Sequence, residues 1–226
     1  ERSQQLHGRR VPPRRGGAGV IRHLLWDLDG TLIDSYPAIA GAYQEAAAEL
    51  GYRMITDEVY ALAKVSLTTC ITELARCAGA DKARMSEACQ KAYAAVDPAV
   101  QPVMPFAREV LAAVCARGGC NVIVTHRERA STTALLAAHR LTGYFSGIIA
   151  GDDGYPRKHD PAAYLAALAR YQLDPCETMA VGDRAVDVLG ARAAGLVSFL
   201  YGRDPLGAAP EYLADDYAEL LALIAL

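Results

Sequence analysis

The sequence has no long apolar run, no paired cysteines and no strong net charge, and each absence excludes a class of protein. No stretch approaches the roughly 18 apolar residues that a membrane-spanning helix needs, and no apolar segment typical of a secretory signal is present. Six cysteines occur, but none form a Cys-x-x-Cys pair and most fall in apolar helical patterns. We therefore expect core cysteines in a reducing cytoplasm, without a zinc site, a disulfide framework or a membrane partner.

The charge balance argues against nucleic acid as a partner of the whole molecule, because the formal net charge is -3 at pH 7. Basic residues are nevertheless unevenly placed, since residues 1–19 contain five arginines and one acidic residue among several prolines and glycines. This stretch has no apolar periodicity, and we interpret it as a flexible basic leader. A disordered tail is the simple interpretation, and an arm that binds a polyanion is the alternative.

Apolar patterning predicts an α/β fold. Short β-branched or apolar runs alternate with helical periodicity after residue 105, and one more such run lies upstream. The predicted strands are 21–27, 121–125, 147–150, 178–181 and 197–200, and the predicted helices among them include 162–170, 185–194 and 217–223. Alternation of this kind is typical of a doubly wound parallel sheet with helices on both faces.

A helical block interrupts the alternation directly after the first predicted strand. Apolar stripes at helical spacing occupy about 36–101, and prolines at 98, 102 and 105 then break the pattern. We therefore predict a leader at 1–19, an α/β core formed by 20–35 and 102–226, and an inserted four-helix domain at 36–101.

Polar residues gather where three predicted strands end, which is the edge at which open parallel sheets bind ligands. The first strand ends in Asp27 and Asp29, followed by Gly30 and Thr31. Side chains two residues apart in a strand point the same way, so the two aspartates either converge or straddle the end of the strand. The other polar residues predicted at this edge are Thr125, His126, Arg127, Lys158, Asp183 and Asp187.

Several carboxylates at one edge need compensation. Two unit charges about 4 Å apart interact by roughly 4 kcal/mol when the effective dielectric constant is near 20. The cluster must therefore hold protons or bind a cation. An all-oxygen set with few protein ligands suits Mg²⁺, which pairs with phosphate. Because Lys158 adds a fixed positive charge and a carboxylate can attack phosphorus, the cluster predicts a site for a phosphate dianion.

These residues resemble the four motifs of the haloacid dehalogenase superfamily of phosphotransferases. The segment Asp-Leu-Asp-Gly-Thr-Leu from Asp27 is similar to the first motif, and Thr125 and Lys158 are similar to the second and third. The segment from Gly182 to Asp187 is similar to the fourth, and all four occur in family order. The resemblance covers about 20–226, and the helical insertion resembles the C1 cap of the phosphoglycolate phosphatase and β-phosphoglucomutase group.

The resemblance implies a role for each position. Asp27 is the expected nucleophile, and Asp29 is the expected general acid and base. Lys158 is the third expected catalytic residue, because it neutralises charge on the nucleophile and the phosphate. The expected substrate-binding residues are Gly30, Thr31, Thr125 and His126, and the expected metal ligands are Asp27, Asp29 through its backbone carbonyl, and Asp183, with Asp187 in support.

The implied activity is that of a Mg²⁺-dependent phosphatase. It would hydrolyse a small phosphorylated metabolite through an aspartyl-phosphate, as a monomer or homodimer. Lys64 and Ser66 match the substrate-facing loop of the family's cap and are candidates for specificity. A sugar phosphomutase and a catalytically weak binding or regulatory protein stay open as alternatives. A phosphonoacetaldehyde hydrolase would need a cap lysine, for which Lys64, Lys82 and Lys91 are candidates by residue type alone.

Two departures from the family pattern leave every expected catalytic residue in place. The third motif often has Lys-Pro-x-Pro, where this chain has Lys-His-Asp-Pro from Lys158, so the rigidity of this loop is in question. The second motif often continues with Asn and Lys, where this chain has His126 and Arg127. This second departure changes the groups expected near the phosphate.

Overall fold

A computed structural model describes residues 20–203 and 206–225, which divide into two compact units. The first unit contains 20–32 and 103–225, and the second is the continuous segment Ile33–Pro102. Within the first unit, the Met104 N–H donates to the Leu32 carbonyl at 2.9 Å, so the insertion leaves and rejoins this unit at neighbouring positions. The predicted leader lies outside the described residues.

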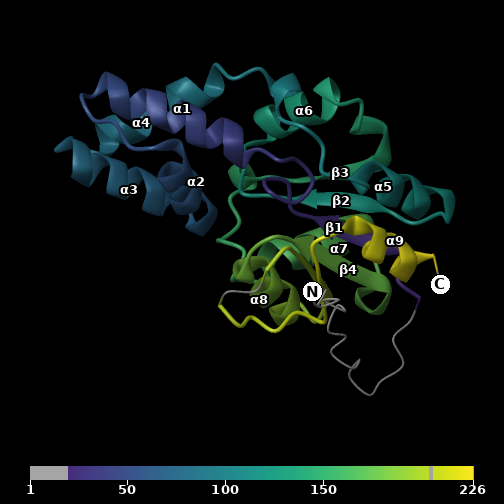
Figure 1. Ribbon diagram of the computed structural model, residues 1–226. Coiled ribbons are helices and arrows are strands. Elements are labelled where there is room, and N and C mark those ends of the chain that lie inside the picture. The colour runs from purple at the N-terminus through teal and green to yellow at the C-terminus, as the bar shows by residue number, and fades with distance from the viewer. Residues whose placement is uncertain (1–19, 204–205, 226) are drawn as a thin grey trace, which may run out of the picture. The chain divides into compact units, whose positions relative to one another are not determined.

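The first unit is built on a six-stranded sheet in which all neighbouring strands are parallel, in the order β3-β2-β1-β4-β5-β6. Figure 1 labels the first four of these strands. The strands are β1 (His23–Trp26), β2 (Asn121–Val124), β3 (Phe145–Ile149), β4 (Thr178–Gly182), β5 (Val197–Tyr201) and β6 (Tyr212–Ala214). Five of them match the predicted strands within one or two residues at each end. The sixth, β6, escapes prediction because a strand this short shows no clear period.

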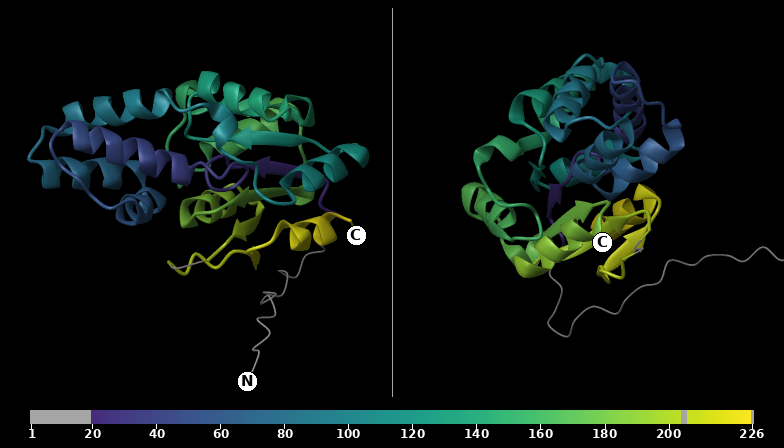
Figure 2. Two further views of the ribbon diagram at one scale, coloured as in Figure 1. Left: turned by 45° about the horizontal axis from the view of Figure 1, so that its top comes forward. Right: turned by 90° about the vertical axis from the view of Figure 1, so that its left-hand side faces the viewer.

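Helices cover both faces of this sheet, and they are α5 (Ala107–Ala116), α6 (Arg129–Ala138), α7 (Ala162–Tyr171), α8 (Ala185–Ala193) and α9 (Tyr217–Ile224) (Figure 2). Leu25 packs in a buried cluster with residues of α7 and α8. The next residue, Trp26, meets the Tyr217 ring of α9 edge-on at 5.5 Å between centroids. Because successive strand residues face opposite sides, this alternation shows both faces of β1 in use. The predicted doubly wound α/β sheet is confirmed.

Short 3-10 helices occur at Pro98–Val100, Thr142–Tyr144, Gly151–Asp153 and Pro175–Glu177. Helix α7 begins one residue after Pro161, while the Asp160 carboxylate accepts the Ala162 N–H at 2.8 Å. The helix therefore starts at residue 162, as the sequence predicts, and ends one residue later than predicted. The expectation for the cysteines holds only in part, since Cys70 and Cys89 are buried but Cys115 and Cys176 are exposed. The last two lie near the ends of elements, where an apolar pattern no longer implies burial.

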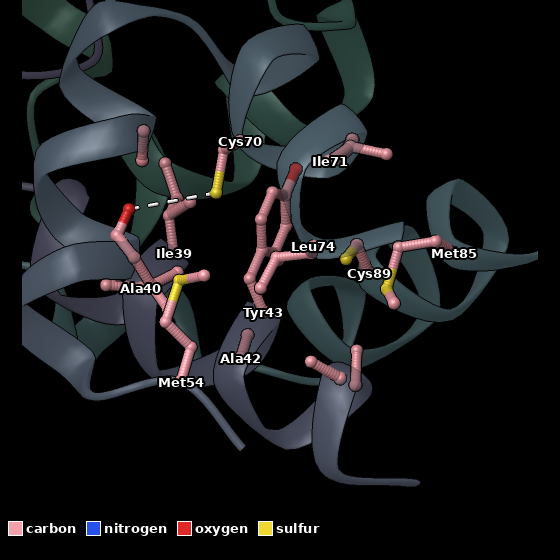
Figure 3. Close-up of a cluster of buried hydrophobic side chains, with 14 of the residues drawn as sticks. Ile39, Ala40, Ala42, Tyr43, Met54, Cys70, Ile71, Leu74, Met85 and Cys89 are labelled. Carbon is pink, nitrogen blue, oxygen red and sulfur yellow. Dashed lines mark hydrogen bonds between the residues drawn. The ribbon is translucent and has the colours of Figure 1, made fainter. Parts of the chain in front are cut away.

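The second unit is helical and has its own core. Its helices are α1 (Tyr36–Glu49), α2 (Thr56–Val65), α3 (Leu67–Ala78) and α4 (Lys82–Ala94). Tyr43, Leu74 and Met85 lie together in that core, and Cys70 donates its thiol hydrogen to the Val59 carbonyl with a 3.7 Å separation (Figure 3). Within the described part of the chain, no helix combines the length and the apolar character needed to cross a membrane.

Candidate active site

The sheet order places a switch point at β1, which has β2 on one side and β4 on the other. Parallel register sets Trp26 beside Ile123 of β2 and Val181 of β4. The residues that follow these strands therefore emerge at the same edge. The Asp27 N–H donates to the Val181 carbonyl at 2.8 Å, which fixes the backbone of Asp27 next to the end of β4. Ligands bind at such an edge in open α/β sheets.

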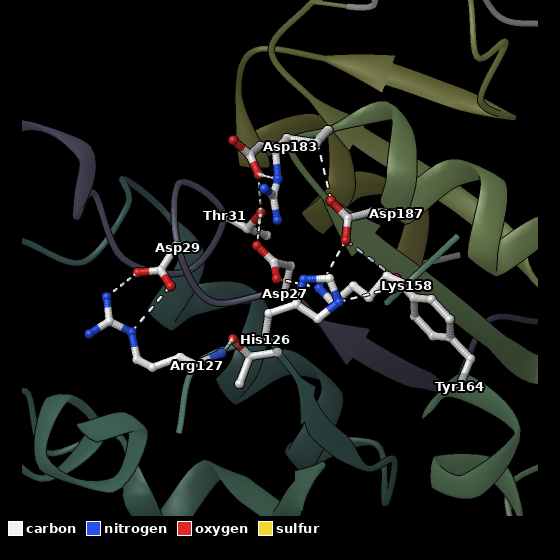
Figure 4. A network of polar contacts seen from close by, with 11 residues as sticks. Asp27, Asp29, Thr31, His126, Arg127, Lys158, Tyr164, Asp183 and Asp187 are labelled. Carbon is white, nitrogen blue, oxygen red and sulfur yellow. Dashed lines mark hydrogen bonds and ion pairs between the residues drawn. The ribbon is translucent and has the colours of Figure 1, made fainter. Parts of the chain in front are cut away.

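A buried lysine joins two of the predicted aspartates (Figure 4). Lys158 Nζ contacts Asp27 Oδ1 and lies 2.9 Å from Asp187 Oδ1, and all three side chains are buried. Burial lowers the pKa of Lys158, but Asp187 and Asp27 outweigh burial and raise its pKa overall. Burial raises the pKa of Asp27. The pKa of Asp187 lies below its ordinary value, because Lys158 and Arg184 outweigh the burial that raises it.

Asp183 completes an acidic cluster with these two aspartates. One carboxylate oxygen from each of Asp27, Asp183 and Asp187 lies within 4.8 Å of the others. Thr31 Oγ1 lies 3.4 Å from Asp27 Oδ2 and 3.4 Å from Asp183 Oδ1, so its hydroxyl sits between them.

The donor set of this cluster fits the predicted metal. Lys158 and Arg184, whose Nε is 3.9 Å from Asp183 Oδ1, oppose three carboxylates, so negative charge is in excess. Hard oxygen donors with excess negative charge match the ligand preference of Mg²⁺.

Asp29 points away from this cluster. Gly30 adopts φ +79°, a turn that glycine makes at little cost, and the chain leaves the direction of β1 there. The Asp29 carboxylate instead forms a two-pronged ion pair with Arg127, from Nη2 to Oδ1 and from Nε to Oδ2 at 3.1 Å (Figure 4). Arg127 Nη1 also donates to Ser131 Oγ at 2.9 Å. Both aspartates of the first motif therefore follow the last residue of β1, and their carboxylates have different partners.

The residues after β2 form hydrogen bonds within their own turn and to the Lys158 loop. Thr125 Oγ1 accepts the Arg127 N–H at 3.1 Å, which tightens the turn beyond the strand. His126 Nε2 accepts the backbone N–H of Lys158 at 2.9 Å. Burial and then the positive charge of Lys158 lower the pKa of His126 to about 4, so the ring is neutral near pH 7. The expected contact of His126 with phosphate thus rests on its backbone N–H, since its ring engages the Lys158 loop.

Two glycines permit close packing beneath the site. A Cβ added to Gly182 would lie 2.3 Å from Asp187 Cβ, and one added to Gly190 would lie 1.8 Å from the Lys158 carbonyl oxygen. Both distances are far shorter than ordinary van der Waals contact. Helix α8 can therefore approach β4 and the Lys158 loop only because these positions lack a side chain.

Lys64 and Ser66, the candidates for substrate specificity, contact other residues of the second unit. Lys64 Nζ lies 5.4 Å from the centroid of the Tyr36 ring and 5.9 Å from that of Tyr60. Ser66 caps α3 by accepting the Thr69 N–H at 2.9 Å. Lys82 and Lys91 are exposed.

Several residues of the site were not predicted as site residues from the sequence. Arg127 was predicted at this edge and as a departure from a motif, but with no role and no partner. Tyr164 OH lies 3.4 Å from Asp187 Oδ1, and Tyr217 OH donates to the Thr31 carbonyl at 2.7 Å. The two tyrosines fall in apolar helical patterns that are typical of core residues. The backbone N–H of Arg184 donates to Asp187 Oδ2 at 3.2 Å, and its position within the fourth motif was the only signal.

Comparison with known proteins agrees with this architecture. Residues 21–195 match the model of a family described as haloacid dehalogenase-like hydrolase. A phosphoglycolate phosphatase from Vibrio parahaemolyticus is 28% identical over 220 residues, or 91% of this chain and 96% of the relative. One from Pectobacterium atrosepticum is 30% identical over 224 residues, or 91% and 93%.

Among solved structures, that of a predicted phosphoglycolate phosphatase from Haemophilus somnus aligns with a TM-score of 0.81. The alignment covers 92% of this chain and 99% of that one at 21% sequence identity. At this identity the likeness establishes the fold alone.

Proposed function

The chain belongs to the haloacid dehalogenase-like hydrolases, and from this premise we propose that it is a Mg²⁺-dependent phosphatase of small phosphorylated metabolites. The observation that carries the proposal is the buried contact of Asp27 with Lys158 beside the carboxylates of Asp183 and Asp187. A nucleophilic carboxylate next to a fixed cation and a metal-ligating oxygen set is suited to phosphoryl transfer. The names of the relatives from Vibrio and Pectobacterium support phosphate ester hydrolysis.

In the proposed first step, an Asp27 carboxylate oxygen attacks phosphorus as the bond from phosphorus to the leaving oxygen breaks. Asp29, which must be protonated at the start of this step, donates its proton to that leaving oxygen, which departs as an alcohol. In the second step Asp29 takes a proton from water, the water oxygen attacks phosphorus, and the bond from phosphorus to Asp27 breaks. Lys158 offsets the charge of Asp27 and of the transferred group throughout. Positioning and charge stabilisation of this kind supply most of the catalysis of phosphoryl transfer.

We propose that Asp27, Asp183 and the backbone carbonyl of Asp29 hold Mg²⁺, with Asp187 in support through its ion pair with Lys158. The bound ion would offset the negative charge shared by nucleophile and phosphate. The residues proposed to surround the phosphoryl oxygens are Gly30, Thr31, Thr125 and His126.

The second unit is the proposed cap. We propose that the inserted helices of 36–101 select the substrate, with Lys64 and Ser66 as candidate contacts. A substrate-selecting lid of this kind would also exclude bulk water from the phosphoryl group. The proposed enzyme is cytoplasmic and acts as a monomer or homodimer.

The test is phosphate release from a panel of phosphorylated metabolites that begins with phosphoglycolate, with Mg²⁺ and with excess EDTA. We expect turnover that requires Mg²⁺, and Asp27→Asn should lower kcat by on the order of 10³-fold or more. Asp57→Asn, a change on the exposed first turn of α2, is the matched control and should keep full activity. Full activity of Asp27→Asn would refute the proposal, and isomerisation of a sugar phosphate without phosphate release would favour the mutase.

A further inference from the structure

The ring of His126 links two loops that are far apart in the sequence. His126 follows β2, and its Nε2 atom accepts the backbone N–H of Lys158, 32 positions further along the chain, at 2.9 Å. Lys158 lies in a turn between the 3-10 helix Gly151–Asp153 and α7, and neither helix nor strand fixes the backbone at this position. In a helix or a strand, a backbone carbonyl would accept the N–H of Lys158. Here the His126 ring accepts it instead.

The other side of the Lys158 backbone is also confined. The Lys158 carbonyl oxygen packs so closely on α8 that a Cβ at Gly190 would lie 1.8 Å from it. The Lys158 peptide is thus held between the His126 ring and α8. Its side chain must reach Asp27 and Asp187 at once, so a small displacement of the backbone would break one of the two ion pairs.

The chemistry of the contact determines the state of the ring. An imidazole nitrogen accepts a hydrogen bond only when it carries no proton, so the neutral ring must hold its hydrogen on Nδ1. Burial first, and then the charges of Lys158, Arg184 and Arg157, lower the pKa of His126 to about 4 against the opposing effect of Asp187. The acceptor is therefore present across the neutral pH range.

We propose that His126 is a positioning residue, whose neutral ring fixes the backbone of Lys158 and so holds the lysine ammonium against the nucleophile. The Lys158 loop, which His126 holds in this way, lacks the first proline often found at the third motif. The kinetic consequence rests on the proposed phosphatase function, whereas the hydrogen bond and the tautomer do not.

The first test is nitrogen-15 NMR of the full chain. We expect His126 in the wild type to be protonated on Nδ1 and unprotonated on Nε2 at neutral pH. His126→Phe, which keeps a ring but removes the acceptor, should speed hydrogen exchange of the Lys158 amide by about tenfold or more. His126→Gln, which restores an oxygen acceptor, should recover most of the protection. A proton on Nε2 in the wild type, or unchanged exchange in a folded His126→Phe, would overturn the proposal.

The second test is steady-state kinetics on the substrate with the highest turnover in the phosphatase panel. His126→Phe should lower kcat by about tenfold with a smaller change in KM, because the ammonium of Lys158 acts mainly on charge in the transition state. His126→Gln should recover most of the loss. His159→Phe, the same substitution at the exposed neighbour of Lys158, should leave kcat unchanged.

Equal loss in the Phe and Gln variants would overturn the positioning role. If no phosphate ester is hydrolysed even by the wild type, the proposed function fails, and the NMR result still decides whether His126 holds Lys158.

Discussion

The two aspartates of the first motif are two residues apart, yet their surroundings differ. Asp27 is buried against Lys158, whereas Asp29 is partly exposed and paired with Arg127. Burial raises the pKa of Asp27, and a cation beside it is what allows a buried carboxylate to stay charged. A carboxylate held in this way suits a nucleophile. A partly exposed carboxylate suits proton exchange with the leaving group and with water.

Arg127 is the residue that orients Asp29, and its two-pronged contact needs a guanidinium. Arg127→Lys cannot make both hydrogen bonds, so we expect kcat/KM for an alkyl phosphate to fall about tenfold. The loss should be smaller for an aryl phosphate, whose leaving group departs without a proton. Steady-state kinetics with both substrates measures the difference. Arg129→Lys makes the same substitution in an ion pair with Asp153, away from the acidic cluster, and serves as the control. Equal losses on both esters would contradict the prediction.

His126 should also contribute to the pH dependence of stability. Its pKa is about 4 in the folded chain and about 6.5 when unfolded. The unfolded chain therefore binds a proton first as the pH falls from about 6.5 to about 4, so this residue lowers the free energy of unfolding across that range. Besides burial, the charges of Lys158, Arg184 and Arg157 lower this pKa, and that of Asp187 opposes them.

Urea denaturation at a series of pH values tests this contribution. His126→Gln has no titrating ring, so the wild type should lose more stability than this variant between neutral and acid pH. Parallel pH profiles for the two proteins would contradict the assignment.

At the scale of elements, the contact of α8 with the Lys158 loop depends on Gly190. Gly190→Ala should destabilise the chain by about 2 kcal/mol, although alanine favours a helix by roughly 1 kcal/mol, because the added Cβ meets a backbone oxygen. The measurement is urea denaturation, with kcat as the second readout, since Lys158 must move.

Gly41 supplies the matched control for this prediction. It lies inside α1 with nothing within 4 Å of an added Cβ. Gly41→Ala should therefore stabilise the second unit by about 0.5–1 kcal/mol. A Gly190→Ala protein as stable and active as the wild type would show that the close approach is not a constraint.

At the scale of the whole molecule, the insertion should be separable from the α/β unit. Leu32 and Met104 are joined by a backbone hydrogen bond of 2.9 Å, and the helical segment has its own buried core. Replacing 34–101 with a short Gly-Ser linker should therefore leave a folded sheet, because closing a short loop costs little entropy. Far-UV circular dichroism and a cooperative thermal transition measure this outcome. We also expect aryl phosphate hydrolysis to persist while discrimination among metabolites falls, and an unfolded or aggregated product would contradict the prediction.

The sequence by itself determined the class of fold and the identity of most residues in the site. Period-2 and helical periodicities reflect local backbone geometry and burial, so five strands were found within one or two residues of their ends. The carboxyl ends of parallel strands share one edge, which is why Asp27 and Asp183 could be expected together. The role of each residue in the reaction stays a prediction.

Only the tertiary structure decided which side chains pair. Arg127 meets Asp29 across 98 positions of sequence, and His126 meets Lys158 across 32. Neither contact has a local signal, because a pair of this kind depends on the order of strands in the sheet and on how far each loop extends. Tyr217 also gives no local signal of its partner, because its hydroxyl donates to the Thr31 carbonyl from a helix whose sequence is mostly apolar. Periodicity records which face of an element is buried, whereas the partner on that face is set by the packing of distant elements.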